Sequence, residues 1–94
     1  MVNRLELSGA IGAKPAIDWE SGTLKLVINF YGNVIRVHMA MADDDLAVAY
    51  ASIVRGDEAT VTGAVTGSIH GIYCIADKIV TKSGWKHENP AKVS

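Results

Sequence analysis

Polar and amphipathic side chains alternate with apolar ones along two neighbouring segments, residues 23–31 and 34–41. An alternation with a period of two predicts β-strands, and it places one set of side chains on a common face. This set comprises Lys25, Asn29, Tyr31, Arg36 and His38. Two cations, an aromatic ring and hydrogen-bonding groups on one face would form a small binding patch. The solvated outer face of any sheet alternates in the same way, so both interpretations stay open.

Two further aromatic residues bear on this patch. Tyr73 belongs to a later strand-like run, where its ring either faces the patch beside Tyr31 or pairs across strands. Trp19 lies in an irregular segment near a turn signal at Ser21 and Gly22. Its ring is either an exposed stacking platform or a cover for one end of the fold, and we prefer the second interpretation because large rings often fold back in this way.

The sequence contains no motif for metal binding or catalysis. His38, His70, His87 and Cys74 form no paired-ligand pattern, and a zinc site needs about four ligands. Asp43 to Asp45 cluster like the carboxylates of a hard-cation site, but their position before a helix explains them through capping. A phosphate-binding glycine loop and a nucleophile elbow are both missing. We therefore expect neither an enzyme nor a cofactor.

The surrounding sequence predicts strands joined by tight turns, and one helix. Strand patterns cover residues 4–9, 23–31, 34–41, 58–63 and 72–80. Gly32 and Asn33 predict a two-residue hairpin loop of type II′ between the second and third of these strands. Residues 42–55 have a helical period with acidic residues in the first turn and Arg55 in the last, and Gly56 is the expected left-handed cap.

The order of these elements is strand, strand, strand, helix, strand, strand. It predicts an all-β fold with one short helix, namely an OB-fold, which is a five-stranded Greek-key barrel with the helix between strands 3 and 4. A meander with an appended helix has the same one-dimensional pattern. Phe30 and Tyr50 share apolar rows with Leu and Ile, so we expect both in the core. The predicted domain covers residues 1–81, and residues 82–94 form a polar tail that we expect to be flexible.

Length and composition restrict the possible functions further. The chain has 94 residues, 49% of them hydrophobic and 20% charged, which suits one folded domain. The formal net charge of −1 hides a segregation, because residues 37–77 carry Arg55 against six carboxylates while residues 78–94 carry four lysines. No apolar run reaches the roughly 20 residues of a membrane helix. Charges interrupt the N-terminus, and Cys74 is the only cysteine. We expect a cytoplasmic protein, either bacterial or made by a phage in its host.

Two segments resemble the bacterial single-stranded-DNA-binding proteins and their relatives, the primosomal replication proteins N (PriB). The first is residues 3–15, N-R-L-E-L-S-G-A-I-G-A-K-P, in which a strand ends at a glycine, a second glycine follows three residues later, and a proline comes after it. The second is residues 46–67, L-A-V-A-Y-A-S-I-V-R-G-D-E-A-T-V-T-G-A-V-T-G, a helix followed by a basic residue, a glycine and a strand. With the hairpin between them, the resemblance covers roughly residues 3–81.

The resemblance implies an OB-fold that binds single-stranded DNA without sequence preference, in replication, recombination or repair. In such proteins bases stack on aromatic rings and phosphates meet a basic groove. Carried onto this chain, the groove residues are Lys25, Asn29, Tyr31, Arg36, His38 and Tyr73, with Trp19 and Lys14 at its edge. The resemblance also implies a homodimer or homotetramer, and replication or primosome proteins as possible partners. A protein-interaction module without nucleic-acid binding is the alternative, since an OB-fold does not fix function.

The chain departs from the family pattern in three places. Gly32 and Asn33 form a minimal turn in place of a long hairpin that embraces the DNA, and the third strand carries Val34, His38 and Ala40 where the family has exposed aromatic residues. The last residues, K-H-E-N-P-A-K-V-S, lack the acidic, Phe-terminated tip that recruits other proteins. These departures predict a minimal version with reduced stacking and no recruitment function, close to PriB or to a phage or plasmid protein.

Overall fold

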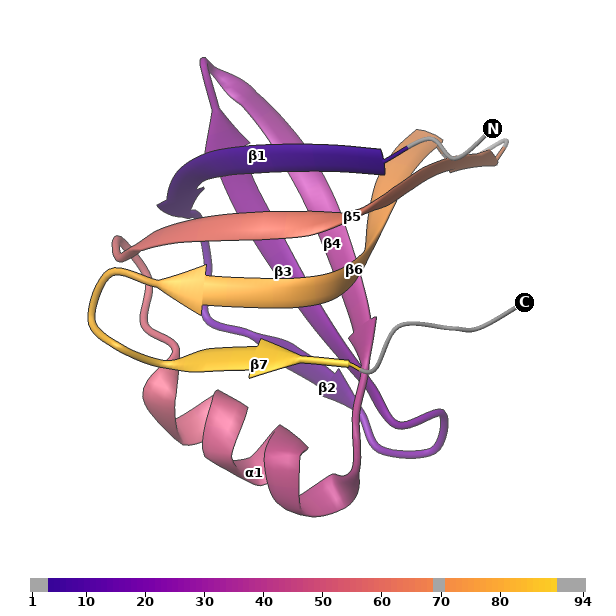
Figure 1. The fold of residues 1–94 in the computed structure, drawn as a ribbon, viewed down its shortest axis with the longest axis vertical. Coiled ribbons are helices and arrows are strands. Elements are labelled where there is room, and N and C mark those ends of the chain that lie inside the picture. Colours follow the sequence, from indigo (N-terminus) through magenta and orange to yellow (C-terminus); the bar gives the residue numbers. More distant parts are fainter. Residues whose placement is uncertain (1–3, 69–70, 90–94) are drawn as a thin grey trace.

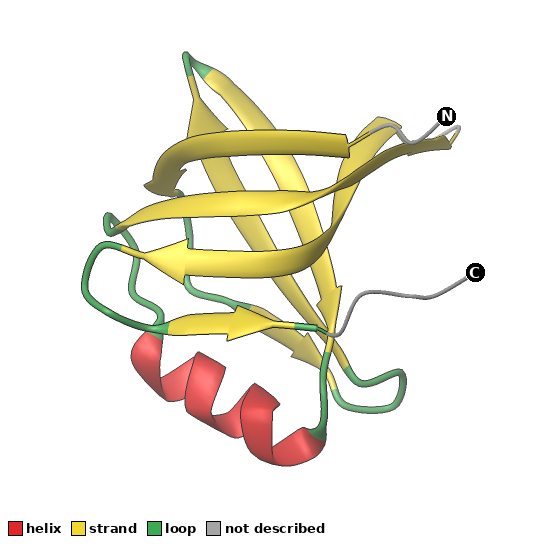
Figure 2. Ribbon diagram, viewed as in Figure 1, coloured by secondary structure: helices red, strands yellow, loops and turns green. Residues whose placement is uncertain are grey.

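A single sheet that closes on itself forms the body of the protein (Figure 1). The computed structural model describes residues 4–68 and 71–89. The strands are β1 (Arg4–Ile11), β2 (Ala16–Asp18), β3 (Thr23–Phe30), β4 (Asn33–Ala40), β5 (Glu58–Ser68), β6 (Gly71–Thr81) and β7 (Lys86–Glu88). The helix, α1 (Asp43–Ser52), lies across one end of the barrel (Figure 2).

The strand pairing confirms the predicted OB-fold. Neighbouring strands follow the order β1, β5, β6, β4, β3, and β3 pairs back onto β1 through Ala10 with Asn29 and Ile11 with Ile28. The β4–β6 pair is parallel, whereas the other pairs of the described strands are antiparallel. A meander would pair β4 with β5, and β5 pairs instead with β1 and β6. The helix stands between the third and fourth barrel strands, as the element order predicts.

Glycine is required where the barrel strands approach one another most closely. A Cβ at Gly9 would collide with the Asn29 carbonyl group and with the Ile28 side chain, at the point where β1 bends onto β3. A Cβ at Gly63 would collide with the Ile75 carbonyl group, beside a β-bulge that shifts the β5–β6 register. The two glycines therefore allow the backbone approach that closes the barrel.

The inward row of β3 and β4 builds the core, together with residues from the other barrel strands and the helix. Its largest fully buried side chains include Leu24, Leu26, Ile28, Met39, Leu46 and Ile79. Phe30 is partly buried and packs against this cluster, as expected. Among the described residues, no helix is long and apolar enough to cross a membrane.

The helix is shorter than predicted, and Tyr50 is not in the core. It ends at Ser52 because Ile53 turns to an extended conformation and is buried, so Arg55 and Gly56 lie in the following turn and do not cap it. Within α1 only Leu46 and Ala49 are buried. Tyr50 follows Ala49 by one position, about 100° around the helix, and its side chain is 44% exposed.

The predicted hairpin exists, but its loop lies one residue earlier than expected. Phe30 pairs with Asn33, so the two loop residues are Tyr31 and Gly32. Their φ angles are 48° and 81°, and positive φ at both central positions is typical of a type I′ turn, not of type II′. The strand-like alternation continues through Tyr31 in the sequence, and for this reason it did not reveal where β3 ends.

Residues 82–89, which the sequence places in a polar tail, carry β7 and extend the sheet. β4 pairs with β6 only at Tyr73–Ile75, and β7 pairs with β6 further along, at Lys78–Val80. Trp85 packs against the core, and its carbonyl oxygen accepts hydrogen bonds from the Thr81 N–H at 2.8 Å and the Thr81 hydroxyl at 2.9 Å. Nδ2 of Asn89 donates to the Ala40 carbonyl at 2.8 Å. β7 thus fills the place beside β6 that β4 leaves when the chain turns into α1.

Candidate functional site

Side chains of β3, β4 and β6 form two parallel rows across the outer surface of the barrel. Because paired residues point to the same face of a sheet, Lys25, His38 and Ile75 form one row, and Val27, Arg36 and Tyr73 form the next. Asn29 and Val34 begin a third row. We call these eight residues the outer patch. It contains two permanent cations and no carboxylate.

Two rings lie together at the centre of the outer patch. The ring centroids of His38 and Tyr73 are 4.7 Å apart, with a tilt of 34° between their planes. Burial lowers the pKa of His38, and the positive charges of Lys25 and Arg36 lower it further. At neutral pH the imidazole is therefore uncharged, and the two rings present adjacent aromatic surface between two cations.

The structure brings together five of the eight residues that the sequence analysis placed in or beside the groove. Lys25, Asn29, Arg36, His38 and Tyr73 all belong to the outer patch. Sequence reasoning did not select the apolar members Val27, Val34 and Ile75 as site residues. The alternation places Val27 and Val34 in the outward row, but the side chain of Ile75 is 49% exposed beside His38 only because of the long-range pairing between β4 and β6.

Tyr31 is not on the sheet face where the sequence places it. It occupies the first loop position of the β3–β4 hairpin, where its side chain is 90% exposed and its ring meets that of Phe30 edge to face at 4.6 Å. The hairpin stands at the top of the barrel in Figure 1, at the end away from α1. Tyr31 therefore projects beyond the outer patch, next to its third row.

Trp19 and Lys14 lie outside the outer patch. Trp19 is 55% exposed in the turn between β2 and β3, so it does not cover the barrel end. Oδ1 of Asp18 accepts hydrogen bonds from the N–H groups of Ser21 and Glu20, which fix this turn and lower the pKa of Asp18. Lys14 places its Nζ 4.3 Å from the centroid of the Tyr50 ring, so its side chain extends toward α1.

A hollow of about 560 Å³ adjoins the outer patch where β4 and β6 separate. Its walls include Leu5, Phe30, Val34, Ile35, Val65 and Tyr73. β4 and β6 pair only from Arg36 and Tyr73 onward, so a gap lies between the two strands before these positions. We call this space the barrel-end hollow. It shares Val34 and Tyr73 with the outer patch.

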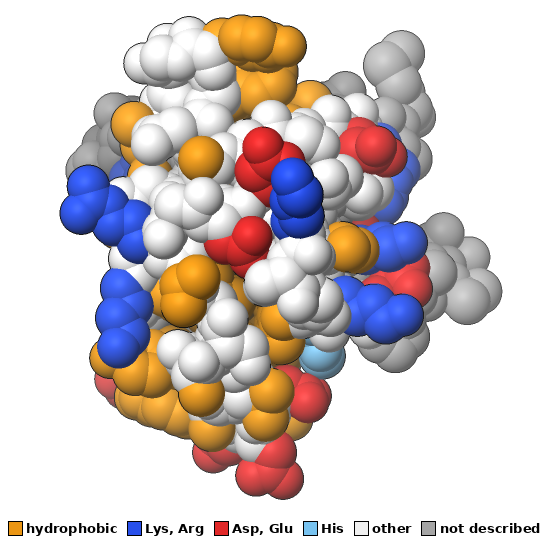
Figure 3. Space-filling model, turned by 90° about the vertical axis from the view of Figure 1, so that its left-hand side faces the viewer, with side chains coloured by type: hydrophobic (Ala, Val, Ile, Leu, Met, Phe, Trp, Pro, Cys, Tyr) orange, Lys and Arg blue, Asp and Glu red, His pale blue; other side chains and the backbone are white. Residues whose placement is uncertain are grey.

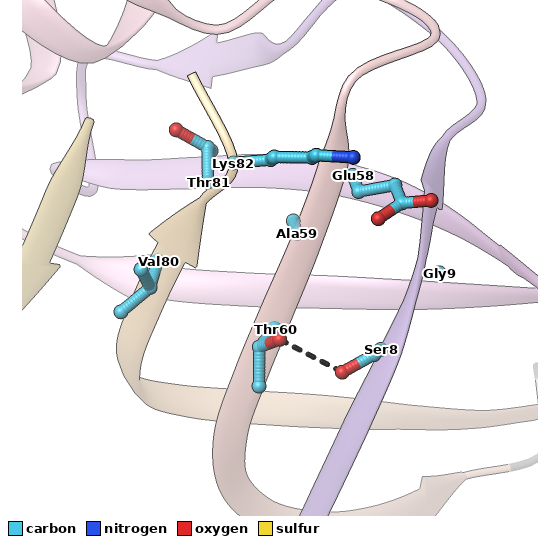
Figure 4. Close-up of a pocket in the computed structure, with 8 residues that line it drawn as sticks. All are labelled: Ser8, Gly9, Glu58, Ala59, Thr60, Val80, Thr81 and Lys82. Atoms are coloured by element: carbon cyan, nitrogen blue, oxygen red, sulfur yellow. Dashed lines mark hydrogen bonds between the residues drawn. The ribbon is translucent and has the colours of Figure 1, made fainter. Parts of the chain in front are cut away.

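A smaller hollow of about 320 Å³ lies over β1, β5 and the end of β6. Figure 4 shows the hydroxyl groups of Ser8 and Thr60 in contact, at 2.7 Å, and the Lys82 side chain extending over β5 toward Glu58. None of the residues proposed from the sequence lines this space. Polar and apolar groups line it in similar proportion, and none of its lining side chains is aromatic.

Hydrophobic side chains also gather on the surface over α1, in the lower part of Figure 3. Val48 in α1 and Val54 just after it are each 55% exposed, and Tyr50 of α1 is 44% exposed. The acidic residues Asp43–Asp45 stand at the first turn of the same helix. This surface is separate from the outer patch, because none of the patch residues belongs to the helix or to the turn after it.

Comparisons with known proteins identify the fold. No protein-family model matches the sequence, and no curated protein has a similar sequence. Among solved structures, a small single-stranded DNA-binding protein from Streptomyces coelicolor matches with a TM-score of 0.64 and 16% identity, over 87% of this chain and 94% of that one. The mitochondrial single-stranded DNA-binding protein Rim1 of S. cerevisiae matches with a TM-score of 0.64 and 15% identity, over 98% and 100% of the two chains.

Larger proteins contain the same fold. The chain spans 57% of a chain in the S. pombe Stn1–Ten1 complex, with a TM-score of 0.67 and 21% identity over 83% of its own length. It spans 20% of asparaginyl-tRNA synthetase from Pyrococcus horikoshii, with a TM-score of 0.72 and 13% identity over 89% of its own length. Together with the closed barrel and the position of α1, these matches show that the chain has an OB-fold.

Proposed function

We propose that this protein binds single-stranded DNA across the outer patch, largely without sequence preference. The observation that carries the proposal is the pair of rows in which Lys25 and Arg36 flank the rings of His38 and Tyr73, with no carboxylate among the patch residues. The cations neutralise phosphates, and the rings and exposed aliphatic groups contact bases, each of which has a π-face. The matches to two single-stranded DNA-binding proteins over nearly their whole length support this assignment.

The cellular role follows as part of the same proposal. A sequence-tolerant binder of single strands serves replication, recombination or repair, where such strands are exposed. We further propose that it acts as a homodimer or homotetramer, because several OB-folds can then share one strand and sum their contacts. Replication or primosome proteins are the protein partners expected for such a role.

The proposal is tested by titrating a fluorescent oligo-dT of about 30 nucleotides at low and at moderate salt. We expect binding that weakens as salt rises. Tyr73→Ala is expected to lose about 1–3 kcal/mol of binding free energy, the value of one base–aromatic stack. Tyr50→Ala is the matched control, since this exposed tyrosine lies on α1, and it is expected to bind like the wild type. An unmodified affinity in the Tyr73 variant, or no binding at low salt, would contradict the proposal.

A second candidate function is protein–protein interaction through α1. Exposed apolar residues of α1 and of the segment just after it, namely Val48, Tyr50 and Val54, favour it, because exposed apolar surface is typical of interaction sites. Salt separates the two functions: an apolar interface persists as ionic strength rises, whereas DNA binding weakens. Val48→Asp is expected to abolish a protein contact on α1 and to leave oligo-dT binding unchanged.

A further inference from the structure

The barrel-end hollow has a structural cause in the strand pairing of the barrel. β4 and β6 are hydrogen-bonded only where Arg36–His38 face Tyr73–Ile75, and before that they diverge. The divergence opens a space of about 560 Å³, within the range of about 300–1,000 Å³ that small-ligand sites occupy. All the residues that line it belong to strands of the barrel, namely β1, β3, β4, β5 and β6.

The chemistry of the barrel-end hollow suits a flat, apolar group with a phosphate attached. Phe30, Ile35 and Val65 supply apolar walls, and none of the residues that line it carries a charge. The guanidinium group of Arg36 lies at its rim. Gly71 is one of the lining residues, and a Cβ added to it would be 3.1 Å from Nη2 of Arg36. An apolar space with a guanidinium group at its edge fits a nucleobase inside and its phosphate outside.

The hollow is also continuous with the outer patch. Tyr73 contacts His38 on the patch and also lines the hollow, and Val34 belongs to both. A single-stranded DNA that lies across β4 and β6 on the outer patch would thus reach the hollow without leaving the protein surface. This continuity, with the cation at the rim, favours a nucleotide over an apolar peptide or a second copy of the chain.

We propose that the barrel-end hollow holds one unstacked base of the bound strand. The inference rests on the proposed function and adds to it that one nucleotide differs from the rest. The other bases lie on the outer patch, whereas this base lies in the hollow where β4 and β6 separate. Binding therefore depends strongly on the presence of a base at one position of the strand and is tolerant of sequence at the others.

A thermodynamic cycle between the protein and the DNA tests this inference. The shortest oligo-dT that keeps full affinity is used, so that it cannot slide, and single abasic sites are introduced at each position in turn. The protein variant is Val65→Phe, which fills the hollow from its wall, and Val65→Leu is a smaller change in case the first does not fold. Val48→Phe, on the exposed surface of α1, is the matched control.

If the hollow holds a base, Val65→Phe lowers the affinity for intact oligo-dT by about 5- to 150-fold. At one position of the DNA, an abasic site lowers the affinity of the wild type by a similar factor but does not lower the affinity of the variant any further. At every other position an abasic site lowers the affinity of the two proteins equally. Val65→Leu is expected to show a smaller loss at the same position, and Val48→Phe none.

Equal abasic costs in wild type and variant would overturn the inference while leaving the proposed function intact. So would a change in the mass of the DNA-free protein on Val65→Phe, measured by light scattering, because it would place a second copy in the hollow. Failure of the wild type to bind oligo-dT at low salt would instead overturn both the proposed function and this inference.

Discussion

His38 is the residue through which pH acts on the outer patch. Its pKa is lowered from 6.5, first by burial and then by Lys25 and Arg36. In the unfolded chain these causes are absent, so the unfolded state binds more protons as the pH falls through 6.5. The contribution of His38 to stability is therefore complete above the unfolded pKa and is lost as the pH falls toward the folded pKa. Bound phosphates would instead raise the pKa of His38, because their negative charge favours the imidazolium form.

This opposition predicts that DNA binding strengthens in mild acid. Lowering the pH from about 7.5 to about 5.5 is expected to raise the affinity for oligo-dT, because a proton is taken up by His38 when phosphates approach. His38→Gln should remove most of this pH dependence. His87→Gln, on β7, is the control and should retain it. The same pH dependence in both variants would show that His38 does not meet the strand.

Tyr31 stands in a backbone conformation that its side chain disfavours. A left-handed φ costs an ordinary residue roughly 1–2 kcal/mol, and asparagine pays less. Tyr31→Asn and Tyr31→Ala both remove the ring, but only the first suits the turn. We expect the free energy of unfolding of the Asn variant to exceed that of the Ala variant by about 1 kcal/mol. Equal stability of the two variants, measured by urea unfolding, would contradict the role of the turn.

At this scale the sequence predicts faces better than positions along the chain. A period of two assigns Lys25, Arg36 and His38 to one face because that assignment needs only local geometry. It does not show where a strand ends, so it places Tyr31 on the sheet although this residue forms the loop. It also does not pair strands that are distant in sequence, and for that reason the exposure of Ile75 beside His38 was missed.

At the scale of elements, local signals predicted the strands of the barrel, but only tertiary contacts explain β7. The three residues Lys86–Glu88 are too few and too polar to show an apolar alternation. They form a strand because β4 pairs with β6 only as far as Ile75, which leaves that edge of β6 open while β5 occupies the other edge, and because Trp85 anchors the segment to the core. From the sequence alone, a polar stretch of this kind therefore predicts a tail, whereas in the folded protein it forms a strand at the edge of the sheet.

The two tryptophans give a direct test of β7. Trp85→Ala is expected to lower the free energy of unfolding by about 2–3 kcal/mol, somewhat less than for a fully buried ring, because it removes the anchor that holds β7 on β6. Trp19→Ala is the matched control, since this ring is 55% exposed, and it should change stability by less than about 0.5 kcal/mol. Both values come from denaturant unfolding. A Trp85 variant as stable as the control would mean that β7 contributes little to the fold.

At the scale of the whole molecule, the net charge of −1 conceals a separation of charge in space. The acidic first turn of α1 lies at one end of the barrel, whereas the outer patch carries Lys25 and Arg36 and no carboxylate. Over a screening length of about 8–10 Å a bound strand responds to nearby charges far more than to the total. The OB-fold makes this separation possible, because α1 lies across one barrel end (Figure 1) and contributes none of the residues of the outer patch.

Salt dependence measures how many of these cations meet phosphates. For single strands the slope of log K against log salt is about −0.7 per neutralised phosphate, so the two permanent cations predict a slope of about −1.4 for an oligonucleotide that covers one patch. Lys25→Ala should reduce the magnitude by about 0.7. Lys82→Ala, whose side chain lies over the smaller hollow, should leave it unchanged. A slope steeper than about −3 would require cations outside the outer patch, and the strand would then follow a path over the barrel different from the one proposed.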